Sequence, residues 1–201
     1  MKTTIRRVWM GMALAFLVTA CASRPSASGL DRAGTGRSPE RGFVRTDTGR
    51  SVTAPAGIAT PRRALLHEAQ RHIGDPYVYG GRAPGGFDCS GFISYVYRMA
   101  AETELPPVSN SLGGMGKTIP FEEAMPGDVL IFSSRPGGKL IDHTAILFEK
   151  SPDGKLAGSK IIHAVSDGPK TGVLTGTLGN SRGTEYFLQR YMYTKRFLED
   201  E

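Results

Sequence analysis

Cys89 stands between an acid and a serine in the stretch GGFDCSGFISYVY, residues 85–97. Apolar residues recur after it at intervals of three and four, which predicts a helix with one buried face. Asp88 suits the N-cap of that helix, so Cys89 falls in the first turn, where unpaired backbone N–H groups favour a thiolate. The pattern therefore predicts a nucleophilic cysteine whose pKa is lowered by the start of the helix.

A structural role for this cysteine is the alternative. Buried cysteines usually behave as small apolar side chains, and that role fits poorly between Asp88 and Ser90. The chain has one other cysteine, Cys21. Because Cys21 belongs to a signal-like segment at the start of the chain, a disulfide between the two cysteines is not expected.

A cysteine nucleophile needs a base and a group that orients the base. After Cys89 the chain has two histidines, His143 in DHTAILFEK and His163 in KIIHAVS. Both stretches are typical of strands, and SPDG between them is a turn signal. A hairpin centred on Asp153 places His143 directly opposite His163, with Cβ atoms about 5 Å apart. One imidazole then acts as base and the other as its hydrogen-bond partner, although the loop could shift this register by two residues.

Two other interpretations of these side chains stay open. Cys89, His143 and His163 could bind zinc, but the chain has no closely spaced ligand pair beside them. Both histidines could also be structural. His67 and His72 are five residues apart and cannot share a helix face as a metal pair would, so both are expected at the surface.

The segments before the cysteine must position it. TPRRALLHEAQRHIG, residues 60–74, predicts a helix that begins near Pro61 and ends at Gly74. Its apolar positions fall on one face: Leu65, Leu66, Ala69 and Ile73. DPYVYGGRAPGG then predicts a loop whose backbone can turn tightly and approach a ligand. Further along, PGDVLIF predicts a turn followed by a buried strand.

The start of the chain has the three-part pattern of a secretory signal. Three basic residues precede an uncharged, mostly apolar run over residues 8–20, and small residues then lead to Cys21. The run is shorter than the roughly 20 residues that span a bilayer. It resembles a bacterial lipoprotein signal, which implies cleavage before Cys21 and acylation of its thiol. Ala22 favours delivery to the outer membrane, and an ordinary signal peptide is the alternative.

Charge and composition divide the rest of the chain. Residues 22–60 are rich in Ser, Gly, Thr, Pro and Arg, and such a stretch buries too little apolar surface to fold, so we expect a flexible tether. Residues 61–201 carry 16 Lys and Arg against 16 Asp and Glu and are expected to form one domain. The net charge of +6 therefore belongs to the signal and the tether. A neutral domain argues against nucleic-acid binding.

The motifs resemble, in order, those of the NlpC family of cell-wall cysteine peptidases. The matching stretches are DPYVYGGRAPGGFDCSGFISYVY, PGDVLIF, DHTAILFEK and KIIHAVS. The resemblance implies a reduced papain-like α+β fold, in which the helix that begins at the cysteine packs on an antiparallel sheet carrying both histidines. It implies these roles: Cys89 as nucleophile, His143 as general base, His163 as the residue that orients the base, Tyr77 near the oxyanion, and Asp88 and Ser90 shaping the substrate site. No metal or cofactor is implied.

The resemblance also implies a substrate, with two departures. The hairpin between His143 and His163 is longer than in compact members of the family, so its loop is a candidate to overhang the cleft. The family often has Leu-Pro-Arg-Thr-Ser after the cysteine helix, where this chain has LPPVS, so Pro107 replaces an arginine. Peptidoglycan stem peptides are the implied substrate. The D-Ala to diaminopimelate crosslink is preferred, and the γ-D-Glu to diaminopimelate bond is second. An inactive wall-binding lipoprotein and an acyltransferase or amidase of the same superfamily are alternatives. We expect a monomer, lipid-anchored on the periplasmic face of the outer membrane.

Overall fold

The computed structural model describes residue 57, residues 60–167 and residues 170–199. The predicted signal, Cys21 and nearly all of the predicted tether lie outside these residues. The first helix begins at Thr60, one residue before the expected start of the domain. Within the described segments, none of the helices is long and apolar enough to cross a membrane.

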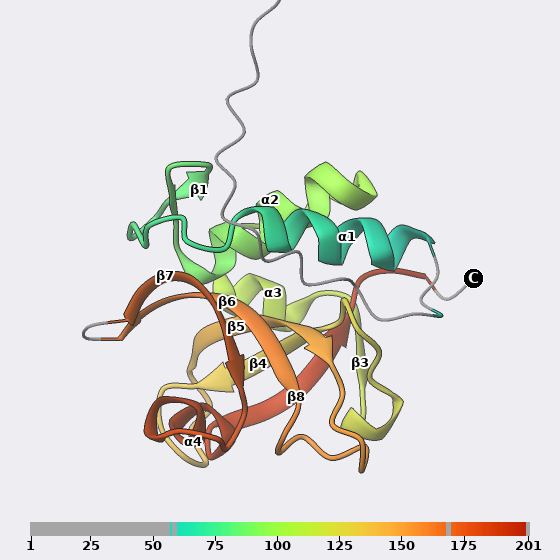
Figure 1. The fold of residues 1–201 in the computed structure, drawn as a ribbon, viewed down its shortest axis with the longest axis vertical. Coiled ribbons are helices and arrows are strands. Elements are labelled where there is room, and N and C mark those ends of the chain that lie inside the picture. The colour runs from blue at the N-terminus through green and yellow to red at the C-terminus, as the bar shows by residue number, and fades with distance from the viewer. Residues whose placement is uncertain (1–56, 58–59, 168–169, 200–201) are drawn as a thin grey trace, which may run out of the picture. The chain divides into compact units, whose positions relative to one another are not determined.

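The longer helices come first along the described chain and most strands of the main sheet follow in a run, in the manner of an α+β protein (Figure 1). The helices are α1 (Thr60–Arg71), α2 (Cys89–Ala101), α3 (Ser109–Gly114), the 3-10 turn η1 (Phe121–Glu123) and α4 (Arg182–Leu188). The strands are β1 (Arg82–Ala83), β2 (Gly86–Phe87), β3 (Lys117–Ile119), β4 (Val129–Ser133), β5 (Ile141–Glu149), β6 (Lys160–Asp167), β7 (Lys170–Thr177) and β8 (Tyr191–Arg196).

Six of the strands form one antiparallel sheet in the order β3-β8-β4-β5-β6-β7. The strands β1 and β2 form a separate small hairpin just before α2. In Figure 1 the sheet curls, with α1, α2 and α3 on its upper side and α4 below it. This is the expected helix-on-sheet architecture.

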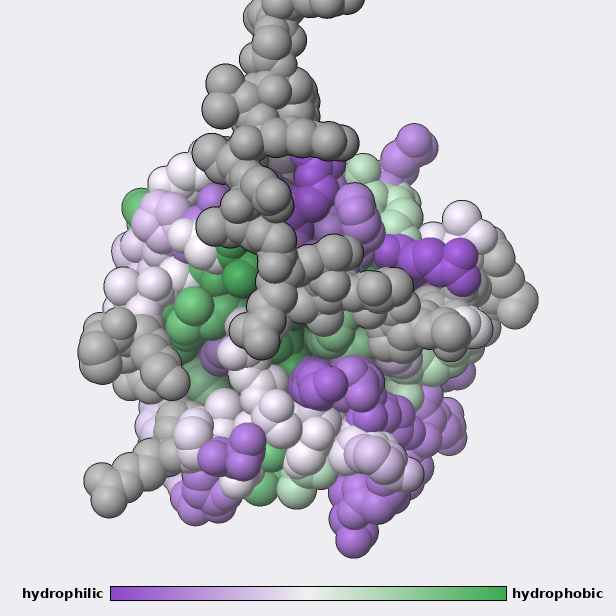
Figure 2. All heavy atoms as spheres, viewed as in Figure 1, coloured by the Kyte–Doolittle hydropathy of each residue, from purple (hydrophilic) through white to green (hydrophobic). Residues whose placement is uncertain are grey.

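Each face of the sheet has its own apolar core. Residues of α1 and α2 pack with alternate residues of the central strands, including Ile131, Ile146 and Ile162. The other residues of the same strands, including Ala145 and Ile161, pack on the second face with Phe187 of α4. On the side seen in Figure 2, hydrophobic residues gather across the middle of the molecule, between polar regions above and below. Alternation along the strands therefore holds the sheet between two layers.

A buried ion network ties α1 to the sheet. The carboxylate of Asp128, before β4, accepts a hydrogen bond from Arg62 Nη1 at 2.9 Å and another from Arg196 Nη2 of β8 at 2.9 Å. Asp128 is fully buried, and Arg62 and Arg196 are 3% and 8% exposed. The backbone N–H of Met125 donates to the same carboxylate. These partners satisfy a charge that burial alone would disfavour.

Asp128→Ala is therefore expected to lower the free energy of unfolding by about 3–5 kcal/mol, because it removes the buried carboxylate that pairs with the guanidinium groups of Arg62 and Arg196. Urea unfolding followed by circular dichroism measures the loss. Glu149→Ala is the matched control. It breaks the exposed ion pair with Lys160, which is worth about 0–1 kcal/mol. Equal stabilities for the two variants would contradict this reading of the network.

Two expectations for the first helix were wrong. Leu65, Leu66 and Ala69 are buried as predicted, but Ile73 is 40% exposed because the helix ends at Arg71, before Gly74. His72 is buried rather than on the surface. Its ring nitrogens bond Asp75 Oδ2 at 2.9 Å and Glu68 Oε1 at 3.2 Å, so His72 fixes the exit of the chain from α1.

Candidate active site

Asp88 caps α2 and fixes the position of Cys89. Its Oδ1 accepts hydrogen bonds from the backbone N–H of Gly91 at 2.6 Å and from the hydroxyl of Ser90 at 3.1 Å. Its Oδ2 accepts from the N–H of Gly80 at 2.9 Å. The predicted N-cap is confirmed. Asp88 also ties the glycine loop to the helix start, so its carboxylate organises the site through the backbone.

The glycine loop folds back over the beginning of α2. The Asp88 N–H donates to Gly81 O, and Tyr77 forms a bridge with Phe87. A Cβ on Gly91 would lie 2.0 Å from Gly81 O, so only glycine permits this approach. The fold-back brings the half-buried Tyr77 to the same cleft as Cys89. Burial and then the negative charges of Cys89 and Asp88 raise the pKa of Tyr77, so its hydroxyl keeps its proton and can donate.

The thiol of Cys89 lies beside the first residues of β5. Its Sγ is 3.5 Å from the hydroxyl of Ser109 and 4.0 Å from the carbonyl oxygen of Asp142. Burial raises the pKa of this thiol and the charge of Asp88 raises it further, whereas Ser109 and Thr144 oppose the rise because they can donate hydrogen bonds to the ionised sulfur. The predicted lowering of the pKa was therefore wrong for the resting protein, because burial outweighs the helix start.

The two histidines lie together as expected, but in a different register. His143 Nε2 and His163 Nδ1 are 2.9 Å apart in a buried hydrogen bond. The strands pair Ile146 with Ile162 and Leu147 with Ile161, two residues away from the predicted register. The histidines are therefore diagonal neighbours instead of direct partners, a distance that long side chains still bridge.

Burial keeps both imidazoles neutral. It lowers the pKa of His163 to about 4. Burial also lowers the pKa of His143 well below its usual range, and a positive charge on His163 would lower it further. Phe187 of α4 packs against both rings, with ring centroids 4.6 Å from His143 and 5.2 Å from His163. A neutral imidazole is the form that can accept a proton.

The free energy of unfolding is expected to fall as the pH is lowered from about 6.5 towards 4. His163 has a pKa of about 4 in the fold, against about 6.5 when unfolded. Between these values the unfolded chain binds a proton that the folded chain does not, so stability rises with pH there. This contribution is complete above about pH 6.5, is lost as the pH falls to about 4, and amounts to about 3 kcal/mol.

Urea unfolding across this pH range tests the expectation. The shift of His143 acts in the same direction, so His163→Gln removes one of two contributing groups. The variant should show a shallower dependence of stability on pH than the unchanged protein. Identical slopes would mean that His163 titrates normally in the fold.

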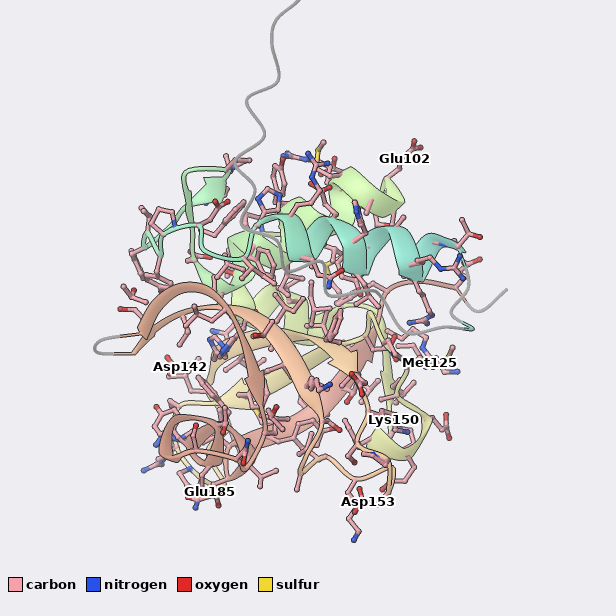
Figure 3. The ribbon with its side chains drawn as sticks, in the orientation of Figure 1. Glu102, Met125, Asp142, Lys150, Asp153 and Glu185 are labelled. Carbon is pink, nitrogen blue, oxygen red and sulfur yellow. The ribbon has the colours of Figure 1, made fainter. Side chains whose placement is uncertain are left out.

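A cleft of about 480 Å³ opens above the thiol. Its lining comes from the glycine loop, the start of α2, the segment before α3 and the start of β5: Tyr77, Tyr79, Gly80, Arg82, Asp88, Cys89, Ser90, Pro107, Val108, Ser109, Asn110, Ile141 and Asp142. Figure 3 shows Asp142 near the start of β5, with Lys150 and Asp153 at the opposite end of the hairpin. The hairpin turn therefore lies away from the cleft.

Sequence reasoning missed two neighbours of the candidate catalytic groups. Ser109 contacts the thiol, and it occupies the serine position of the stretch LPPVS, where only Pro107 had drawn attention. Phe187 covers the histidine pair from α4, and no local pattern marks it. Pro107 lines the cleft. The one cation among the described residues of this lining is Arg82, of β1.

The histidine pair leaves no arrangement typical of zinc. In the described part of the chain, no group of three or more His, Cys, Asp or Glu side chains is placed to hold a metal ion. His143 Nε2 and His163 Nδ1 point at each other, whereas zinc ligands converge on a shared centre.

Comparisons with known proteins agree with the geometry. A sequence model of the NlpC/P60 family matches residues 74–193. A "Probable endopeptidase" of Mycobacterium tuberculosis is 40% identical over 80 residues, covering 40% of this chain and 20% of that protein. The "Gamma-DL-glutamyl hydrolase" of Bacillus subtilis is 39% identical over 80 residues, covering 39% of this chain and 19% of that protein. The chain thus spans about a fifth of the length of these relatives.

Among solved structures, the NlpC/p60 domain of the peptidoglycan hydrolase SagA superposes with a TM-score of 0.52 at 30% sequence identity. The match covers 68% of this chain and 98% of that domain. The similarity therefore extends over the whole of the compared domain, from the helices to the curled sheet.

Proposed function

The chain belongs to the NlpC/P60 family, and on that premise we propose that it is a cysteine endopeptidase that cleaves the peptides of peptidoglycan. One observation carries the proposal. A thiol at the start of α2 opens into the cleft beside β5, the strand that carries one member of a buried, hydrogen-bonded imidazole pair. Nucleophile, base and orienting group are the three parts that such a reaction needs.

The hydrogen bond between the imidazoles supports the proposed roles of His143 as base and His163 as orienting residue. Because His143 Nε2 faces His163 Nδ1, His143 has Nδ1 left to accept the thiol proton. The neutral tautomer that can do so carries its proton on Nε2 and donates it to His163 Nδ1. His163 must then be neutral, with its own proton on Nε2. Its lowered pKa keeps it in this form.

The reaction then follows from general base catalysis. His143 takes the proton of Cys89 as the sulfur attacks the peptide carbonyl, and a tetrahedral oxyanion forms. The backbone N–H of Cys89, in the first turn of α2, and the hydroxyl of Tyr77 hold this oxyanion. His143 returns the proton to the leaving amine as the C–N bond breaks. Water, deprotonated by His143, then hydrolyses the thioester and frees the thiol.

Tyr77→Phe is expected to lower kcat by about 10- to 1000-fold with little change in KM, because the hydroxyl bonds the oxyanion only in the transition state. Steady-state kinetics on a crosslinked muropeptide measures both constants. Tyr79→Phe is the control, since Tyr79 lines the same cleft but is 91% exposed. It should change kcat by less than a few-fold. Equal activities of the two variants would mean that Tyr77 lines the cleft without binding the oxyanion.

We propose peptidoglycan stem peptides as the substrate. Such peptides carry free carboxylates, and Arg82 supplies a positive charge in the lining of the cleft. The D-Ala to diaminopimelate crosslink is the preferred bond and γ-D-Glu to diaminopimelate the second. The name of the Bacillus subtilis relative favours the second for that protein. Digestion of purified sacculi, with the products read by mass spectrometry, distinguishes the two bonds and tests hydrolysis itself.

We also propose that the mature protein begins at an acylated Cys21 and is held on the periplasmic face of the outer membrane. The support is the uncharged run followed by small residues and cysteine. The intact mass of the membrane-extracted protein and its partition into detergent test the anchor. A different mature N-terminus together with aqueous partition would refute it.

A further inference from the structure

Thr144 follows the catalytic His143 along β5 and carries an unexplained polar group. The residue is fully buried. Among the buried side-chain nitrogen and oxygen atoms that the structure describes, its hydroxyl oxygen is the one without a hydrogen-bond partner. Buried hydroxyls almost always form a hydrogen bond, and one without a partner destabilises the fold. Its presence therefore calls for an explanation, such as a role in catalysis.

The position of Thr144 in the fold indicates which group its hydroxyl can contact. Along β5, Thr144 shares a face with Ile146 and Phe148, and these two pack with α2 residues such as Phe92 and Ile93. Both α2 and β5 begin at the cleft, where Cys89 Sγ is 4.0 Å from Asp142 O. Cys89 lies one turn before Phe92 and Ile93 on α2. Thr144 lies two residues before Ile146 on β5, on the same face of the strand. The packing of α2 on β5 therefore brings Cys89 and Thr144 together.

We propose that Thr144 is a further catalytic residue, whose hydroxyl donates a hydrogen bond to the sulfur of Cys89 as the thiol loses its proton. The inference rests on the proposed cysteine mechanism. A neutral thiol accepts hydrogen bonds weakly, so the hydroxyl has no partner at rest. A thiolate accepts them strongly, so the bond forms when charge develops on the sulfur. The thiol proton still passes to His143 Nδ1, and Thr144 keeps its own.

Hydrogen bonding at the sulfur agrees with this role. The hydroxyl of Thr144 and its backbone N–H both act to lower the pKa of Cys89, against the rise that burial causes. Ser109 acts in the same sense from the start of α3. The backbone N–H is present whatever residue stands here, whereas the hydroxyl depends on threonine. Thr144 thus offsets part of the cost of ionising a buried thiol.

The proposal is tested with Thr144→Val, which removes the hydroxyl and keeps the shape, and with Thr144→Ser, which keeps the hydroxyl and removes a methyl group. The full chain carries Cys21→Ser in every case, so that Cys89 is its single thiol. The readout is the rate of alkylation by iodoacetamide as a function of pH. It reports the thiolate fraction and needs no substrate.

Thr144→Val is expected to raise the pKa of the thiol by about one unit and to slow alkylation about tenfold at neutral pH. Thr144→Ser should stay within about twofold of the unchanged protein, since the donor remains. The titratable and charged side chains that line the cleft around the sulfur are retained in every variant: Tyr77, Tyr79, Arg82, Asp88 and Asp142. His143, next to Thr144 in the sequence, is retained as well. Equal alkylation profiles for the valine variant and the unchanged protein would overturn the proposal.

Stability and turnover separate this inference from the proposed function. Thr144→Val removes an unpaired buried hydroxyl, so it should unfold at an equal or higher urea concentration than the unchanged protein. A clearly less stable valine variant would reveal a structural partner for the hydroxyl and overturn the role. Slower alkylation in a stable valine variant supports the contact to the sulfur even if the unchanged protein cleaves no sacculi. That last result would refute the proposed function alone.

Discussion

Cys89→Ala is expected to abolish the cleavage of muropeptides, with kcat/KM falling by about 10⁴-fold or more. The thiol is the one nucleophile that the proposed mechanism contains, and Ser109, whose hydroxyl lies 3.5 Å from it, cannot replace it because a hydroxyl ionises far less readily than a thiol. The measurement is the release of products from purified sacculi and from a defined crosslinked muropeptide, followed by mass spectrometry over long incubations.

The fold should survive this change. The Asp88 cap bonds Gly91 and Gly80 rather than the cysteine side chain, and the side chain loses a single sulfur atom. Circular dichroism and urea unfolding should therefore resemble those of the unchanged protein to within about 1–2 kcal/mol. Cys89→Ser is the companion variant, and it should also be inactive because a hydroxyl ionises far less readily than a thiol. Turnover by folded Cys89→Ala would end the thiol mechanism.

Local patterns predicted the parts of the site that depend on local physics. The spacing of apolar residues after Cys89 and the acid before it correctly predicted α2 and its Asp88 cap. Alternation along the two histidine strands correctly placed His143 with Ala145 and His163 with Ile161 on shared faces. Helix capping and strand alternation involve neighbours within a few residues, so the sequence carries them directly.

The register between β5 and β6 could not be predicted from such local patterns. The hairpin was predicted to be centred on Asp153. In the structure a turn that Ser151 closes, with Gly154 at a φ of +74°, moves the centre of the strand pairing by one residue, to Gly154. A bulge between Leu147 and Glu149 adds to the irregularity. Turn geometry and bulges decide register, and the ten-residue connection between β5 and β6 allows several registers that local sequence patterns favour equally.

Burial was the second property that the sequence could not supply. The raised pKa of Cys89 and the lowered pKa of His163 come mainly from loss of solvent, which depends on elements far away in the chain. His72 was expected at the surface, but it packs against Phe87 and Tyr95. Long-range packing of this kind has no local signature, and Phe187 above the imidazole pair is a further case.

His143→Ala is expected to lower kcat/KM by about 10³- to 10⁴-fold, nearly as far as loss of the thiol. Without the base, only sulfur that has already ionised can attack. Because burial raises the pKa of Cys89, the remaining activity should climb with pH through the alkaline range. The unchanged protein keeps its imidazoles neutral near pH 7, so its activity should vary little there. Kinetics on the crosslinked muropeptide across pH, with iodoacetamide alkylation alongside, measures both effects.

His163→Ala is the matched comparison, since His163 reaches the thiol only through His143 Nε2. Water can replace an orienting nitrogen in part, so this loss should be about 10- to 100-fold, and the variant should keep the pH dependence of a protein that still has its base. The two variants thus differ in the shape of the profile as well as in rate. If His163→Ala were the slower of the two and its activity climbed with pH, the roles of base and orienting residue would have to be exchanged.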